Sequence, residues 1–252
     1  MNDRLAGKAV VVAGGSAGIG RAISSCFADE GADVVILARR RDRLDEAVAA
    51  CGEHASGIVT DISEPDSVRA AFAEIGDRYG RVDVLLNVAG IARVRTIEEA
   101  SDEDISAVVG TNFLGPIYTT RSAIPLLRNS AGADIVNVSS EITLDDMPLM
   151  TLYSSTKRGL DGFTRSMTKE LKPPGIRVTL VVMGTVGETA FADNFGPGDA
   201  ERAIPLWSAD GYMSRVAGAD HPMDASWVAE SMLHAITRPR GMMTDVMHMC
   251  VF

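Results

Sequence analysis

The sequence predicts a doubly wound α/β fold, with a mostly parallel sheet of about seven strands and helices on both faces. Short apolar, β-branched segments alternate along the chain with longer segments of helical character. Segments such as V-V-I-L-A are nearly continuous apolar runs, which are typical of strands covered on both faces. The chain of 252 residues shows no repeat, linker or break in composition, so we expect a single domain.

The elements follow one another in a regular βαβα order. The expected strands are Ala9–Ala13, Val34–Ala38, Gly57–Thr60, Val84–Asn87, Ile135–Ser139, Val178–Val182 and Val246–Val251. The expected helices are Gly20–Glu30, Asp42–Cys51, Pro65–Tyr79, Asp102–Val109, Pro116–Arg128, Ser154–Leu171 and Ala225–Thr237. Right-handed crossovers between parallel strands would then place helices on both faces of the sheet.

Residues 189–222 break this alternation. They mix aromatic side chains, including Phe191, Phe195 and Trp207, with Gly and Pro, and they show no clear period. A long insertion after a late strand of such a fold usually serves function. We therefore expect residues 189–222 to form a substrate-binding lid.

Composition excludes several classes of partner. A formal charge of −10 and a pI near 4.9 disfavour binding to nucleic acid or to an anionic membrane surface. No apolar run reaches the ~20 residues of a membrane span, and no signal segment precedes the first strand, so a cytoplasmic location is expected by default.

We expect no metal, because neither cysteines nor histidines show ligand spacing. These residues are Cys26, Cys51, Cys250, His54, His221, His234 and His248.

A glycine-rich loop, A-G-G-S-A-G-I-G at residues 13–20, joins the first strand to the first helix. Missing β-carbons permit a tight turn and let the backbone approach a pyrophosphate, which the helix N-terminus then attracts. The spacing of the glycines is G-x-x-x-G-x-G, and the alternative is an ordinary glycine-rich turn. The residues expected to contact a dinucleotide here are Gly14, Ser16, Gly18, Ile19 and Gly20.

The second strand ends in I-L-A-R-R-R. Proteins that bind NAD typically place an acid here for the ribose 2′-hydroxyl, whereas this chain has Ala38 followed by Arg39. A guanidinium can pair with a 2′-phosphate through two hydrogen bonds. We therefore expect Arg39 and Arg40 to favour NADP(H), with NAD(H) still able to bind. The alternative is that these arginines only begin a solvated helix.

Tyr153 and Lys157, in Y-S-S-T-K, lie four residues apart and would project from one face of a helix. A free phenol, with a pKa of about 10, is a poor acid or base near neutrality, and a nearby ammonium favours the phenolate. Ser140, at the end of the fifth strand, could donate to an oxygen on which charge develops. Taken alone, a Tyr and a Lys at this spacing could equally be a solvated helix face.

Further motifs appear in a fixed order. Asp61 follows the third strand, N-V-A-G occupies residues 87–90 and Asn112 lies in G-T-N-F. With the glycine loop and Y-S-S-T-K, these motifs resemble the short-chain dehydrogenase/reductase family, a Rossmann-fold family, over nearly the whole chain, from about Leu5 to Met249. The chain differs from the family's usual residues at Ala13, Val88 and Met183.

The resemblance implies a role for each motif. It implies that Ser140, Tyr153, Lys157 and Asn112 form the catalytic set, with Tyr153 as general acid or base and Asn112 holding a water near Lys157. It implies further cofactor contacts at Asp61, Ile62, Asn87, Ala89, Gly90, Tyr153, Lys157, Gly184 and Val186. It also implies a homodimer or homotetramer, built through the helices near 116–128 and 154–171.

The function expected is an NADP(H)-dependent oxidoreductase that interconverts a small-molecule carbonyl and a secondary alcohol by hydride transfer. Two alternatives stay open: a non-catalytic dinucleotide-binding regulator, and a lyase or epimerase on the same fold. The acids Glu141, Asp145 and Asp146 precede Tyr153 and form either solvated surface or a negative rim on the substrate mouth.

Overall fold

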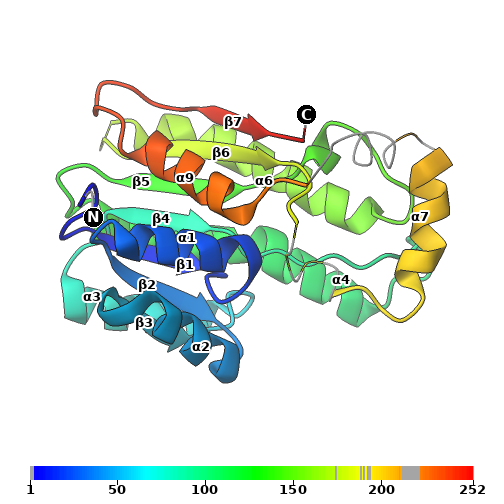
Figure 1. Ribbon diagram of the computed structural model, residues 1–252, viewed down its shortest axis with the longest axis horizontal. Helices are drawn as coiled ribbons and strands as arrows, with labels where there is room; N and C mark the ends of the chain where they lie inside the picture. The colour runs from blue at the N-terminus through cyan, green and yellow to red at the C-terminus, as the bar shows by residue number, and fades with distance from the viewer. Residues whose placement is uncertain are drawn as a thin grey trace.

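The computed structural model describes residues 3–173, 175–187, 189, 191, 194–209, 211 and 222–251. Within these residues the centre of the molecule is a seven-stranded parallel sheet in the order β3-β2-β1-β4-β5-β6-β7 (Figure 1). Its strands are β1 (Ala9–Ala13), β2 (Asp33–Ala38), β3 (Ala55–Val59), β4 (Val84–Asn87), β5 (Asp134–Val138), β6 (Arg177–Met183) and β7 (Val246–Met249). The predicted doubly wound fold is confirmed.

Helices cover both faces of the sheet. One face carries α1 (Gly18–Asp29), α2 (Arg41–Cys51) and α9 (Ala225–Ile236), whose apolar side chains pack on the strands as one core. The other face carries α3 (Pro65–Tyr79), α5 (Gly115–Leu127) and α6 (Thr151–Leu171), with a second core. β1, β4, β5 and β6 are buried along their whole length, as their nearly continuous apolar sequences require.

Two elements differ from the expectation. A π-helical turn, Gly110–Leu114, joins α4 (Asp102–Val109) to α5, where the sequence indicated a break between two helices. Inside the expected lid, the structure has a helix that the sequence pattern did not reveal, α7 (Asp199–Ala209), set apart from the sheet (Figure 1). Within that segment, residues 190, 192, 193, 210 and 212–221, which include His221, lie outside the described residues.

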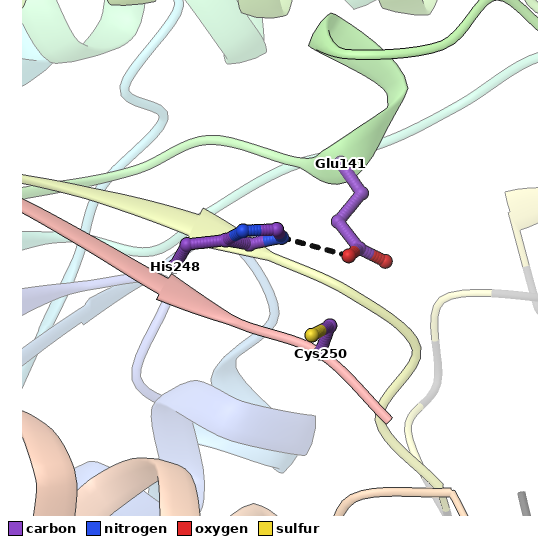
Figure 2. Close-up of side chains that lie close together, drawn as sticks. All are labelled: Glu141, His248 and Cys250. Atoms are coloured by element: carbon purple, nitrogen blue, oxygen red, sulfur yellow. Dashed lines mark hydrogen bonds and ion pairs between the residues drawn. The ribbon is translucent and has the colours of Figure 1, made fainter. Parts of the chain in front are cut away.

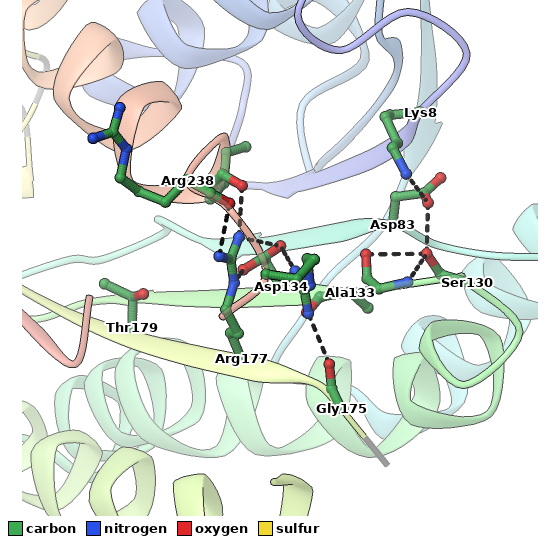
Figure 3. A network of polar contacts seen from close by, with 12 residues as sticks. Lys8, Asp83, Ser130, Ala133, Asp134, Gly175, Arg177, Thr179 and Arg238 are labelled. Carbon is green, nitrogen blue, oxygen red and sulfur yellow. Dashed lines mark hydrogen bonds and ion pairs between the residues drawn. The ribbon is translucent and has the colours of Figure 1, made fainter. Parts of the chain in front are cut away.

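At the end of the sheet opposite the strands' carboxyl termini, a polar network fastens the C-terminal segment to the core (Figure 3). Asp134 at the start of β5 accepts hydrogen bonds from the guanidinium groups of Arg177 and Arg240. Arg177 also donates to the carbonyl oxygens of Ile236 and Met242, on either side of the turn that leads into β7. The buried charges are therefore paired and hydrogen-bonded, as buried ions must be.

Across the described part of the chain, no helix has the length and apolar character needed to span a membrane.

Candidate active site

A cavity of about 930 Å³ opens at the carboxyl ends of the strands, the edge where ligands bind in open parallel sheets. It is lined by sixteen of the predicted site residues: Gly14, Ser16, Gly18, Ile19, Gly20, Arg39, Arg40, Asp61, Ile62, Ala89, Gly90, Ser140, Tyr153, Lys157, Gly184 and Val186. Asn87 and Asn112 lie outside this lining. Motifs that are far apart in the sequence therefore meet around one space.

The glycine loop has the geometry of a backbone cradle. Gly14 adopts a φ of +90°, and a β-carbon there would lie 2.6 Å from the backbone nitrogen of Ala89. A β-carbon at Gly20 would overlap with the carbonyl oxygen of Gly14. No side chain caps the N-terminus of α1, so its first N–H groups remain for an anion at the cavity wall. These features fit the pyrophosphate of a dinucleotide.

Arg39 and Asp61 face each other where the cavity meets the ends of β2 and β3. A guanidinium nitrogen of Arg39 lies 3.9 Å from a carboxylate oxygen of Asp61, and Arg39 is 56% exposed. The other carboxylate oxygen of Asp61 accepts from the backbone and hydroxyl of Ser63. Asp61 does not cap α3, because the N-cap position of that helix belongs to Glu64. Its carboxylate is thus held in a turn with one oxygen toward the cavity.

Tyr153 and Lys157 both lie on the first turns of α6 and line the cavity. The ammonium nitrogen of Lys157 is 5.8 Å from the centre of the Tyr153 ring and donates to the carbonyl oxygen of Val138, 2.8 Å away. Lys157 is only 2% exposed, and burial lowers its pKa to about 8. The pair is therefore a desolvated phenol and amine at the cavity floor.

Two hydroxyls end β5 beside this pair. The Ser140 oxygen accepts a hydrogen bond from the backbone of Ile142, at 3.4 Å, and thereby caps a 3₁₀ turn, Glu141–Thr143. The Ser139 hydroxyl is buried and has no hydrogen-bond partner among the described residues. Both serines line the cavity, so the structure places two hydroxyls next to Tyr153's helix.

Asn112 lies beneath the cavity, fully buried in the π-helical turn. Its side-chain oxygen accepts from the backbone N–H of Ile91, and its amide nitrogen donates to the Ile91 carbonyl and to Thr156. The next turn begins with Pro116, which has no N–H to donate to the Asn112 carbonyl. The side chain of Asn112 therefore fixes the loop after β4, and its carbonyl oxygen cannot accept the usual helical hydrogen bond from residue 116.

Asn87 does not line the cavity, because its side chain is engaged by residues of α5 and β5. Its amide nitrogen donates to the Asn137 side-chain oxygen at 2.8 Å, and Asn137 donates in turn to Thr164 on α6. Thr119 on α5 donates to the Asn87 oxygen. A chain of buried hydrogen bonds therefore runs from α5 through β4 and β5 to α6.

Aromatic side chains form one wall of the cavity beside Tyr153. The ring of Tyr153 lies 5.4 Å from Phe191, which contacts Phe195 edge-on at 5.8 Å, and Phe195 contacts Trp207 at 6.4 Å. The indole N–H of Trp207 donates to the Pro148 carbonyl. Ile91, Ile142, Met147 and Met150 complete the apolar lining around these rings. The end of the cavity at Tyr153 is thus apolar.

Ion pairs hold α7 against the loop that follows β4. Arg95 in that loop pairs with the buried carboxylate of Asp199 at the start of α7. Arg202, one turn further along, pairs with Glu99 at 2.9 Å and lowers the pKa of its carboxyl to about 2. The aromatic wall is therefore supported from outside by charged contacts.

Comparison with known proteins identifies this architecture. A family model described as short chain dehydrogenase matches residues 8–199. The chain belongs to the short-chain dehydrogenase family. Carbonyl reductase family member 4 of Danio rerio is 36% identical to it over 197 residues, which are 78% of this chain and 82% of that protein.

Solved structures agree with this assignment. The closed form of serine dehydrogenase complexed with NADP⁺ superposes with a TM-score of 0.83 at 24% identity, over 95% of this chain and 93% of that one. The 3-ketoacyl-(acyl-carrier-protein) reductase from Brucella melitensis complexed with NADH superposes with a TM-score of 0.83 at 26% identity, over 98% and 97%. The chain is an NAD(P)-dependent oxidoreductase of this family.

Of the acids before Tyr153, one lies at the rim of the cavity and two lie on the solvated surface, the two alternatives that the sequence left open. Glu141 lines the cavity of this short-chain dehydrogenase, and its carboxylate oxygen lies 2.8 Å from His248 Nε2, from which it accepts when that nitrogen carries the proton. Asp146 pairs with Arg158 on the exposed face of α6, and Asp145 is exposed outside the cavity lining. Only Glu141 is therefore placed on the rim.

Proposed function

We propose that the protein interconverts an apolar ketone and the corresponding secondary alcohol with NADP(H), using Tyr153 as general acid and base. The observation that carries this proposal is the position of Tyr153: its ring joins the aromatic wall on one side and has the buried ammonium of Lys157 on the other. A phenol in that position meets both the substrate space and the group that can stabilise its phenolate.

When bound, the nicotinamide supplies or accepts the hydride. In the reducing direction Tyr153 gives its hydroxyl proton to the carbonyl oxygen, and in the oxidising direction it removes the alcohol proton. Ser140 donates a hydrogen bond to the same oxygen and stabilises the charge that develops there. The charged form of Lys157 favours the phenolate that Tyr153 leaves behind.

Asn112 is proposed to help replace, from the solvent, the proton that Tyr153 gives to the substrate. Pro116 leaves the Asn112 carbonyl without the hydrogen bond that an α-helix would provide, so this oxygen can accept from a water between Lys157 and the solvent. The side chain of Asn112 is engaged with Ile91 and Thr156 and holds the turn in place. Asn112 is therefore proposed to act through its main chain.

The substrate is proposed to carry an aryl or bulky alkyl group, because the lining near Tyr153 is built from Phe, Trp, Met and Ile side chains. Burial of such a group contributes about 25 cal/mol per Å² of apolar surface. The aromatic wall comes from residues 189–222, which supports their proposed role as a substrate lid.

Tyr153→Phe tests the reaction. We expect turnover of aryl ketones with NADPH to fall by about 10²–10⁴-fold while cofactor affinity is retained, because only the transferable proton is lost. Tyr79→Phe, outside the cavity, is the matched control. Turnover by Tyr153→Phe within about threefold of the wild type would reject Tyr153 as the acid, since general acid–base catalysis is worth far more than that.

A further inference from the structure

The end of β7 meets the loop after β5 in a cluster of three side chains that the dehydrogenase reaction does not require. Glu141, His248 and Cys250 present one potential ligand atom each, and these atoms all lie within 4.8 Å of one another. His248 Nε2 and Glu141 Oε1 are 2.8 Å apart. Figure 2 shows the three side chains pointing toward one another across the gap between the two segments.

The backbone holds these residues together without help from the cluster itself. His248 lies in β7, opposite Val182 of β6, and Cys250 follows two residues later, on the same side of an extended chain. Glu141 begins the 3₁₀ turn that Ser140 caps. The N–H of Gly184 donates to the Met249 carbonyl at 2.8 Å and pins the strand end between the two ligands. The arrangement is therefore set by the sheet edge.

The chemistry of the donors selects the ion. Thiolate, imidazole and carboxylate together suit Zn²⁺, whereas Mg²⁺ and Ca²⁺ prefer sites of oxygen ligands only. Ligand atoms at about 2.0–2.3 Å from a tetrahedral zinc lie roughly 3–4 Å from one another, so a small adjustment of the side chains suffices. Half-exposed His248 and exposed Cys250 leave a fourth position open to water.

We propose that Glu141, His248 and Cys250 form a zinc-binding site at the rim of the dinucleotide cavity. On binding, the Cys250 thiol releases its proton to the solvent, and His248 offers the Nε2 lone pair with its proton on Nδ1. The ion joins the C-terminal strand to Glu141, the neighbour of Ser140. It lies close to Gly184, which is next to the Glu141 carboxylate. Zinc occupancy thereby links the chain's C-terminal end to two segments of the active site.

The test is calorimetric titration of the full metal-free chain with Zn²⁺, with Mg²⁺ as the control ion. We expect one equivalent of zinc in the wild type and no response to Mg²⁺. His248→Gln and Cys250→Ser should each lower the zinc affinity by at least about tenfold, the smallest loss typical even of outer-sphere partners. His234→Gln and Cys26→Ser, which alter the same residue types elsewhere, should leave it unchanged.

Substitution of Co²⁺ provides a second measurement, because a thiolate ligand produces a charge-transfer absorption that Cys250→Ser must abolish. Thermal unfolding of each variant without metal shows whether it folds as the wild type does. Absence of zinc binding by the wild type overturns the proposal. Equal affinity in Cys250→Ser, or an equal loss in Cys26→Ser, overturns it as well, because the ion would then lie elsewhere.

Discussion

The ammonium of Lys157 is hydrogen-bonded to the main-chain oxygen of Val138 at the end of β5, 2.8 Å away, at a depth where the lysine is 2% exposed. Burial lowers the pKa of Lys157 to about 8, and the nearby carboxylate of Asp161 only partly opposes this effect. Without cofactor, the protein therefore carries a charged group at neutral pH that its surroundings solvate poorly.

Lys157→Met should alter the pH dependence of stability in the cofactor-free protein. The unfolded chain binds the Lys157 proton more tightly than the folded chain does. The free energy of unfolding of the wild type, relative to the variant, should therefore rise between about pH 8 and 10.5 and be lowest below pH 8. The slope should not exceed about 1.4 kcal/mol per pH unit.

Urea unfolding of both proteins across this window measures the effect, with Lys169→Met at the exposed end of α6 as the control. A pH-independent difference between the wild type and Lys157→Met would show that Lys157 titrates normally in the folded state.

Arg39→Asp should reverse the cofactor preference. A charge-assisted bidentate contact contributes roughly 1.5–3 kcal/mol, which corresponds to about ten- to a hundredfold in affinity. We expect NADPH to bind to the variant more weakly by that factor, and NADH equally well or better, because the new carboxylate can accept from the ribose hydroxyl.

Fluorescence titration with both cofactors decides this prediction. Arg41→Asp makes the same change of charge at an arginine that pairs with Asp45 and does not line the cavity, so its effect should be small. If the wild type binds NADH as tightly as NADPH, Arg39 does not bind the 2′-phosphate.

Trp207→Leu should weaken recognition of bulky ketones. The substitution removes the edge-on contact with Phe195 and the hydrogen bond to Pro148, while the side chain stays apolar. We expect KM for an aryl ketone to rise roughly tenfold, since about 1–3 kcal/mol is typical for a misfit in an apolar pocket. KM for a small aliphatic ketone should change little.

Trp227→Leu is the matched control, because this second tryptophan is 61% exposed on α9. Steady-state kinetics with the two ketones gives the result. Parallel changes in KM for both ketones would indicate a general disturbance of the fold instead of a contact with the substrate.

The protein should form a homodimer or homotetramer in solution. Of the apolar side chains on α5 and α6, Leu160 and Met167 are buried in the core of the same chain, whereas Ile117 and Phe163 remain partly exposed. A second copy could cover these positions in a closed symmetric assembly. Light scattering at micromolar concentration should return a multiple of 26.7 kDa, and the mass of one chain would contradict the prediction.

The sequence predicted the sheet well because the central strands are mostly apolar, β-branched runs that are buried along their whole length. The glycine loop and the carboxyl ends of β2, β4, β5 and β6 placed most candidate residues around one cavity, since parallel strands share that edge. Side-chain direction was harder to infer. Asn87 ends a strand beside the cavity, yet its side chain is engaged by Asn137 and Thr119 and does not line the cavity.

Other features escaped prediction for physical reasons. Helix α7 contains Pro205, and among its apolar side chains mainly Ala203 and Trp207 are buried, so the sequence carries no clear helical period there. The cluster of Glu141 and His248 joins residues 107 positions apart, which no local spacing can reveal. The sequence holds only the H-M-C pattern near its C-terminal end as a sign of this cluster. That pattern indicates neighbouring ligands only when β7 is known to lie beside β6.

The hydrogen bond between Asn87 and Asn137 bears on how the sheet avoids misalignment. β4 and β5 are apolar on both faces, so their sequences alone distinguish poorly between neighbouring alignments. In the observed register the two asparagines are opposite each other. A shift of two residues would set Asn137 opposite Leu85. Both side-chain amides would then lose their hydrogen-bond partner, which costs about 1–3 kcal/mol of folding free energy for each unsatisfied group. The hydrogen bond between the two buried amides thus selects one register of β4 and β5 from several that apolar packing alone would allow.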